Sequence, residues 1–159
     1  MIYISVVFFI YIITVIAFII GFDLVKESEL DETVATNRFT VIIPFRNEAK
    51  NLPELLQTLL NLNYPQHLFE VILVNDDSED DSIETIKNHL LINETKNYNL
   101  KIINNQRHTN SPKKDAIQAA INQAKHQWII TTDADCIVPV YWLDSFDNFI
   151  QSQSLKMIA

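Results

Sequence analysis

Two carboxylates separated by one residue are the sharpest chemical feature of the sequence. Asp133 and Asp135 follow an apolar stretch, residues 128–132, which the pattern predicts to be a strand. In an extended chain the side chains of residues i and i+2 point to the same side. Two hard oxygen ligands on one side suit Mg²⁺ or Mn²⁺, which bind through few carboxylates and substrate phosphates. The competing interpretation is that Asp133 caps the next turn and Asp135 is a solvated loop acid.

A second polar cluster, Asn75-Asp76-Asp77-Ser78, follows another apolar stretch. An aspartate at a strand end has the acceptor oxygens to bind a base edge or a ribose hydroxyl, and Asp76 is the candidate. The alternative is structural: residues 77–81 resemble the start of a helix, where acids interact favourably with the positive end of the helix dipole.

Lys113 and Lys114 fall in the predicted first turn of a helix that Ser111 caps. Positive charges there oppose the helix dipole, and a local rule broken without local gain often marks a functional site. A diphosphate would accept hydrogen bonds from the lysine and from the free N–H groups of the first turn. The alternative is a solvated pair on a surface turn.

Three further residues follow the predicted strands. Arg46 and Glu48 are open to two interpretations, contact with a nucleotide or a simple surface ion pair. Cys136 comes directly after the acidic pair but has no histidine near it in sequence to act as a base. We therefore expect Cys136 to be a packed thiol and not a nucleophile.

Alternating strands and helices position these residues. Apolar runs predict strands at 39–43, 70–74, 100–103, 128–131 and 155–159, and helical spacing predicts helices at 51–62, 80–91, 112–126 and 139–150. Pro44 is expected to end the first strand. This order is typical of βαβ units and predicts an α/β domain with a Rossmann-like, mainly parallel sheet. Ligands of such sheets bind beyond the carboxyl ends of the strands, where three polar clusters would meet.

The N-terminal segment differs from the rest. Residues 2–22 carry no charge, and a helix of that length spans about 30 Å, the thickness of a bilayer core. A signal peptide would need a basic start, a shorter apolar run and a cleavage site of small residues. We therefore expect a transmembrane helix in residues 1–25, a linker in 26–37 and a catalytic domain in 38–159. Lys26 favours a single-pass topology with the domain in the cytoplasm.

Composition excludes several classes of function. The net charge of −8, from 20 acidic and 12 basic residues, argues against a nucleic-acid partner. The single glycine, Gly21, lies in the apolar segment, so the rest of the chain lacks the glycines of a P-loop or a dinucleotide fingerprint. A single cysteine allows no intrachain disulfide.

Taken in order, four stretches resemble family 2 glycosyltransferases of the GT-A fold. They are residues 39–49, 70–83, 112–125 and 128–143, and the resemblance extends over about residues 39–159. It implies the nucleotide-sugar-binding half of a GT-A domain, with UDP as the family's usual donor nucleotide and Mg²⁺ or Mn²⁺ as cofactor. The acceptor, a glycan or a lipid, is unknown.

The resemblance also implies roles for single residues. The substrate-binding candidates are Pro44, Arg46 and Glu48 in the first loop, Asp76 against the base, Lys113 near the diphosphate, and Asp133 near the ribose. The metal candidates are Asp135, as the direct ligand, and Asp133, which lies nearer the metal-bound waters. Three positions depart from the family pattern: Asn75 replaces an Asp, and Asp77 and Pro112 replace glycines.

The resemblance implies that the acceptor-side catalytic base lies beyond Ala159. We therefore expect no catalytic residue within this chain, which would be truncated at its C-terminus, bind donor weakly and transfer no sugar alone. The reaction implied for the whole enzyme is transfer with inversion. Two alternatives remain: a phosphohydrolase of the haloacid dehalogenase type, which also ends a strand in Asp-x-Asp, and a non-catalytic, membrane-anchored nucleotide-binding or scaffold fragment.

Overall fold

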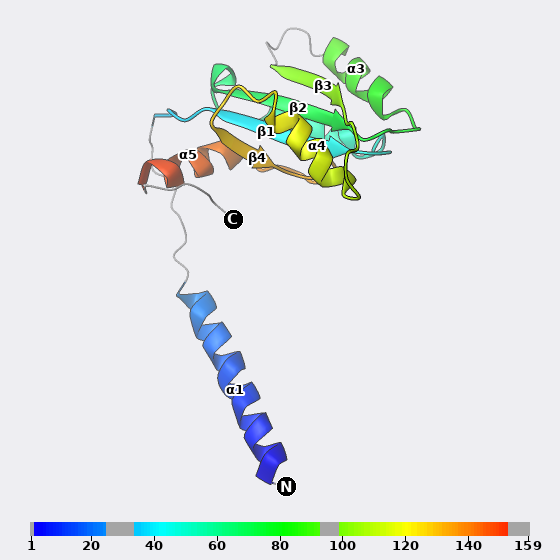
Figure 1. Ribbon diagram of the computed structural model, residues 1–159. Helices are drawn as coiled ribbons and strands as arrows, with labels where there is room; N and C mark the ends of the chain where they lie inside the picture. The colour runs from blue at the N-terminus through cyan, green and yellow to red at the C-terminus, as the bar shows by residue number, and fades with distance from the viewer. Residues whose placement is uncertain (1, 25–33, 93–98, 153–159) are drawn as a thin grey trace.

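The computed structural model describes residues 2–24, 34–92 and 99–152 (Figure 1). The strand expected at 155–159 and most of the expected linker lie outside the described residues. In chain order the elements are α1 (Ile2–Asp23), β1 (Phe39–Phe45), α2 (Leu52–Leu60), the 3₁₀ turn η1 (Gln66–Leu68), β2 (Phe69–Asn75), α3 (Ser82–Ile92), β3 (Leu100–Asn104), α4 (Pro112–Ile121), β4 (Trp128–Thr131) and α5 (Trp142–Ser152).

The four described strands form one sheet in the order β3-β2-β1-β4, and every pair is parallel. β1 and β2 are buried along nearly their whole length, which is why both are written as continuous apolar runs and not as alternating ones. The predicted α/β architecture with a parallel sheet is therefore confirmed. Because all strands run the same way, the loops after β1, β2, β3 and β4 lie at one edge of the sheet.

Helices cover both faces of the sheet (Figure 1). On one face, leucines of α2 pack with Ile86 of α3, Leu143 of α5 and the inward residues of β1 and β2. On the other face, Ala116 and Ala120 of α4 pack against Ile42, Ile72 and Val74 of the two central strands. The two alanines let α4 lie close to the sheet, which fixes where its first turn ends up relative to the strand tips.

The sequence pattern predicts that Pro44 ends β1, but in the structure the strand continues past it. Pro44 pairs in register with Val74, and the strand continues to Phe45. Pro44 is tolerated within the strand because an N–H at this position would point toward β4 and not toward β2. The carbonyl of Ile42 accepts from Thr132 on the β4 side, and backbone groups two residues apart share a side. Pro44 therefore lacks its donor where the β1–β4 ladder, which ends at Ile42 and Thr131, has already stopped.

The helix expected at 112–126 ends five residues early, at Ile121. A short turn follows, and a buried carboxylate then binds the backbone N–H of Lys125 and so draws the chain out of the helical path. Glu70 on β2 is 1% exposed, and its Oε1 accepts from the Lys125 N–H at 2.7 Å and from Thr40 Oγ1 at 2.8 Å. Thr40 Oγ1 in turn accepts from the His126 N–H at 3.3 Å. Glu70 and Thr40 are register partners near the starts of β2 and β1, so they hold the end of the α4 segment far from the strand tips.

A second buried carboxylate ties the entry of the domain to α5. Asp147 is 2% exposed and accepts from the backbone N–H groups of Thr36 and Asn37, at 3.0 and 3.1 Å, and from Gln151 Nε2 at 3.0 Å. Tyr64 donates to the Asn37 carbonyl at 2.7 Å, and burial together with the charge of Asp147 raises the pKa of its phenol. The segment that leads into β1 is thus fixed to the last described helix.

α1 is a single helix of 22 residues. Residues Tyr3–Asp23 are long and apolar enough to cross a membrane, and no part of that apolar window is buried within the described structure. A fully exposed apolar helix has the character of a membrane-spanning segment. A signal sequence meets the same criterion, and the membrane orientation expected from Lys26 remains a prediction.

Candidate functional site

A hollow of about 270 Å³ opens at the tips of the strands. Its lining comes from the loop after β1, the end of β2, the first turn of α4 and the turn after β4: Pro44, Phe45, Arg46, Glu48, Asp76, Lys113, Asp133, Ala134 and Asp135. All seven residues proposed from the sequence as substrate or metal contacts are in this set. The structure therefore brings them together, although their roles remain predictions.

Hydrogen bonds join the loops after β1 and β2. Asn47 N–H donates to Ser78 Oγ at 3.1 Å, and Asn47 Oδ1 accepts from the Glu79 N–H at 2.8 Å. Ser82 Oγ accepts from the Glu48 N–H at 2.9 Å. Arg46 lies 3.5 Å from Glu79, so its ion-pair partner is Glu79 and not Glu48. These contacts make the two loops one unit that forms a wall of the hollow.

The helix-start interpretation of residues 77–81 is correct for one residue. Asp80 Oδ1 accepts from the Ser82 N–H at 3.0 Å, at the start of α3, and its Oδ2 accepts from the Ala49 N–H at 3.0 Å. Asp80 therefore serves the helix and the loop contact together, and its pKa is lowered chiefly by the hydrogen bond that the Ser82 hydroxyl donates to Oδ1. Asp76 has a different role, since it lines the hollow.

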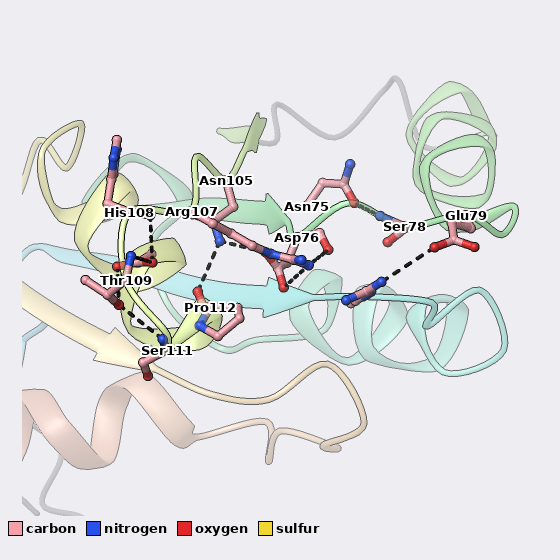
Figure 2. Close-up of polar contacts among 12 residues, drawn as sticks. Asn75, Asp76, Ser78, Glu79, Asn105, Arg107, His108, Thr109, Ser111 and Pro112 are labelled. Atoms are coloured by element: carbon pink, nitrogen blue, oxygen red, sulfur yellow. Dashed lines mark hydrogen bonds and ion pairs between the residues drawn. The ribbon is translucent and has the colours of Figure 1, made fainter.

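Asp76 is held by a residue that the sequence analysis missed (Figure 2). Arg107, in the loop after β3, donates from Nε to Asp76 Oδ1 and from Nη2 to Oδ2, both at 2.9 Å. Asn105 Nδ2 adds a third bond to Oδ1 at 2.7 Å. The Arg107 hydrogen bonds are the main cause that lowers the pKa of Asp76, so this carboxylate stays ionised and rigidly oriented. The missed signal was the polar run Asn104-Asn105-Gln106-Arg107, a fourth cluster at a strand end.

The loop between Arg107 and α4 is organised by Asp115. Its Oδ2 accepts from the backbone N–H groups of His108 and Thr109, at 2.9 and 2.8 Å, and its Oδ1 accepts from Thr109 Oγ1 (Figure 2). The hydrogen bond from the Thr109 backbone is the main cause that lowers the pKa of Asp115. Ser111 occupies the N-cap position, as predicted, but its side chain makes no capping bond. The Asp115 carboxylate instead reaches back from the helix to hold the loop before it.

Lys113 forms an ion pair with Asp133, with Nζ 2.5 Å from Oδ1. The pair joins the first turn of α4 to the turn after β4, and both side chains are more than half exposed. Lys113 is therefore not simply a solvated surface lysine. Its neighbour Lys114 is exposed and lines neither this hollow nor the one beside it.

The spacing argument assumed that the chain is extended at Asp133 and Asp135, but the structure has a turn there. Thr132 is the last residue bonded to β1, and Ala134 and Asp135 form a turn in which the Cys136 N–H donates to the Asp133 carbonyl at 3.3 Å. Both carboxylates nevertheless line the hollow, because buried Ala134 anchors the turn between them. Cys136 is exposed, so the expectation of a packed thiol was wrong: the turn directs it away from the core.

The donor set suits a hard cation only in part. Among the described residues no group of three or more His, Cys, Asp or Glu side chains could hold a metal ion. Asp133 and Asp135 supply two carboxylates on one wall of the hollow. Mg²⁺ and Mn²⁺ accept such a set when phosphates and water complete the coordination. The residues fit a cation that is shared with a phosphate ligand.

The family model described as Glycosyl transferase family 2 matches residues 40–155. The chain belongs to glycosyltransferase family 2. This membership decides against the haloacid dehalogenase alternative. Among curated proteins, this family 2 chain is 36% identical over 100 residues to the undecaprenyl-phosphate 4-deoxy-4-formamido-L-arabinose transferase of Proteus mirabilis (strain HI4320), covering 62% of the chain and 29% of the relative.

Solved structures agree with the family 2 fold. S. aureus TarS 1-349 in complex with UDP superposes with a TM-score of 0.62 at 28% identity, over 72% of this chain and 32% of that TarS chain. A mannosyltransferase from Pyrobaculum calidifontis, in complex with GDP-Man and Mn²⁺, gives a TM-score of 0.66 at 23% identity, over 80% of this chain and 36% of that one, and shows the fold alone. The family 2 chain therefore spans between 29% and 36% of the length of these proteins.

Proposed function

We propose that this chain forms the donor-binding half of a metal-dependent, inverting glycosyltransferase that uses a nucleotide diphosphate sugar, with UDP as the nucleotide. The observation that carries the proposal is that one hollow at the strand tips is lined both by Asp76 and by Lys113, Asp133 and Asp135. TarS, whose fold and sequence this chain resembles, binds UDP and UDP-GlcNAc.

The two sides of the hollow suit the two ends of a nucleotide diphosphate. Asp76 is ionised and fixed by Arg107, so it offers acceptor oxygens to an N–H group of a base or to a ribose hydroxyl. Lys113 and the first turn of α4 offer a positive charge and free N–H groups to the diphosphate. Asp133 lies beside Lys113, with which it is paired, where a ribose or a metal-bound water would be within its reach.

A cation held by Asp135 and Asp133 would neutralise the charge that develops on the departing diphosphate. Lys113 would stabilise the same charge through a charge-assisted hydrogen bond. Deprotonation of the acceptor hydroxyl needs a general base, and we assign no residue of this chain to that role. The chain therefore supplies donor binding and leaving-group stabilisation.

The setting of the reaction is proposed from the relatives and from α1. Relatives include an undecaprenyl-phosphate transferase and a poly-beta-1,6-N-acetyl-D-glucosamine synthase of Staphylococcus epidermidis. These names support a lipid or glycan acceptor and a place in cell-envelope polysaccharide synthesis. We propose that α1 spans the membrane and that the domain lies on its cytoplasmic side.

Calorimetry with UDP and Mn²⁺ on the full chain in detergent micelles tests the proposal. The wild type should bind UDP with a metal-dependent heat, and Asp135→Asn should weaken that binding at least about tenfold, since one of two protein carboxylates is removed. Asp81→Asn, at an exposed acid outside the hollow, is the matched control and should bind as the wild type does. A non-catalytic scaffold would give no metal-dependent heat.

A second test concerns the general base that deprotonates the acceptor hydroxyl, which we do not assign to this chain. Radiolabelled UDP-sugar incubated with the full 159-residue chain, Mn²⁺ and membrane lipid extract should yield no labelled glycan or lipid. Sugar transfer by this chain that disappears in Asp135→Ala would show that our account of the base is wrong, while leaving the donor site intact.

A further inference from the structure

The ion pair between Lys113 and Asp133 is placed where two hollows meet. The hollow described above shares Pro44, Lys113 and Asp133 with a neighbouring hollow of about 330 Å³. The second hollow is otherwise lined by Ile117 of α4 and by Thr131, Thr132 and Cys136 of the β4 end. The pair is therefore part of the wall between the two spaces, and its side chains are 61% and 52% exposed.

Two other charged residues of the site are paired elsewhere. Asp76 is bonded at both carboxylate oxygens by Arg107, and Arg46 lies 3.5 Å from Glu79. Lys113 is thus the cation that sits directly against the acidic pair. Its contact is a single ammonium bond from a flexible four-carbon stem, not a bidentate fork, and an exposed pair of this kind contributes little stability.

Lys113 and a divalent cation would compete for the carboxylate of Asp133. The ammonium already contacts Asp133 Oδ1, and a cation bound to Asp133 and Asp135 would draw on the same carboxylate and repel the ammonium. A diphosphate at the first turn of α4 would offer Lys113 another anionic partner within reach of its stem. The lysine would then add to donor binding instead of opposing the metal.

We propose that Lys113 is an exchangeable counter-charge: it pairs with Asp133 and moves to the diphosphate when donor and metal bind together. The inference rests on the proposed function and specifies how that site is regulated. Its consequence is that Lys113 disfavours binding of the free metal and makes metal and nucleotide bind cooperatively. By thermodynamic linkage, the factor by which UDP tightens Mn²⁺ binding equals the factor by which Mn²⁺ tightens UDP binding.

Mn²⁺ binding to the full chain in detergent micelles, followed by the electron paramagnetic resonance signal of free Mn²⁺, tests this. Lys113→Met should bind Mn²⁺ alone about three- to tenfold more tightly than the wild type, bind UDP about tenfold more weakly, and show a smaller coupling factor between the two. Lys113→Arg should restore the wild-type pattern of competition. Lys114→Met, at the adjacent exposed lysine, should change none of the three quantities.

Asp133→Asn provides the specificity control. In that background Lys113→Met should tighten Mn²⁺ binding clearly less than it does in the wild type, because the shared carboxylate is gone. The inference is overturned if Lys113→Met binds Mn²⁺ alone no more tightly than the wild type, if the coupling factor is unchanged, or if Lys114→Met has the same effect. Failure of the wild type to bind UDP would instead overturn the proposed function, while the measurement with Mn²⁺ alone still decides the competition.

Discussion

Replacing Glu70 by alanine tests how the start of the sheet holds the far end of the α4 segment. The carboxylate is 1% exposed and accepts from the Lys125 N–H and from Thr40 Oγ1. Losing an acceptor for a partly buried backbone N–H costs about 1–3 kcal/mol, and the hydroxyl bond contributes about 1 kcal/mol more. The Lys125 ammonium, 3.5 Å away and 61% exposed, adds little. We expect Glu70→Ala to lower the free energy of unfolding by about 3 kcal/mol.

Glu70→Gln is the matched variant, because its amide oxygen keeps both hydrogen bonds and only the charge is lost. We expect it to cost about 1 kcal/mol. Urea unfolding of the full chain in micelles, followed by the fluorescence of Trp128 and Trp142, measures both. Equal losses for the two variants, or a loss below about 0.5 kcal/mol for Glu70→Ala, would refute the reasoning that the acceptor oxygen is what matters.

We expect the Glu70 carboxylate to make the stability of the domain depend on pH. Burial alone would raise the pKa of Glu70, but hydrogen bonds from the Lys125 backbone and Thr40, with the charges of Lys101 and Lys125, lower it below its ordinary value of 4.5. A lowered pKa in the folded state contributes stability that is complete above the unfolded value and is lost as the pH falls through the folded value. Glu70→Gln should therefore narrow the difference in stability between pH 7 and pH 3, and an unchanged difference would contradict this.

Three further predictions concern one backbone conformation and two side-chain contacts. Asp77 has a φ of 61°, so Asp77→Gly should stabilise the domain by up to about 1 kcal/mol in thermal unfolding, whereas Asp77→Asn, which removes only the charge, should gain less. Arg107→Met should raise the pKa of Asp76 toward its ordinary value, as measured by NMR titration of the carboxyl carbon. An equal pKa in the variant and the wild type would contradict the pairing of Asp76 with Arg107. Asp147→Ala should destabilise the domain by about 2 kcal/mol and speed amide exchange at Thr36 and Asn37, and unchanged exchange there would contradict the proposed anchor.

The fold was largely predictable because its signal is local. Strands buried on both faces are continuous apolar runs, and β4 has the bounds expected from the sequence, Trp128–Thr131. The error at the end of α4 has a non-local cause, since Glu70 lies 55 residues before the N–H that it captures. Helical periodicity continues through that point, so nothing local marks the end of the helix.

The site was predictable to the extent that topology decides it. In a parallel sheet every strand delivers its following loop to the same edge, so polar residues after β1, β2 and β4 had to be neighbours. What topology does not decide is pairing across that edge. The bond between Arg107 and Asp76 spans 31 residues, and the turn that exposes Cys136 depends on the burial of Ala134. Both details depend on tertiary packing, which the spacing of residues in the sequence does not reveal.

The near absence of glycine explains the form of these loops. Tight turns beside phosphate sites usually need a residue with positive φ, a conformation that glycine adopts without cost. Here Asn47, at 56°, and Asp77, at 61°, take that conformation. Asn and Asp adopt this conformation more readily than most residues. Hydrogen bonds hold the loops around both positions: Asn47 Oδ1 accepts from the Glu79 N–H in the loop after β2, and Asn75 Oδ1 accepts from the Ser78 N–H, next to Asp77. Side-chain hydrogen bonds thus hold the wall of the hollow where the family pattern has a glycine turn, and Asp77 keeps a backbone strain that glycine would relieve.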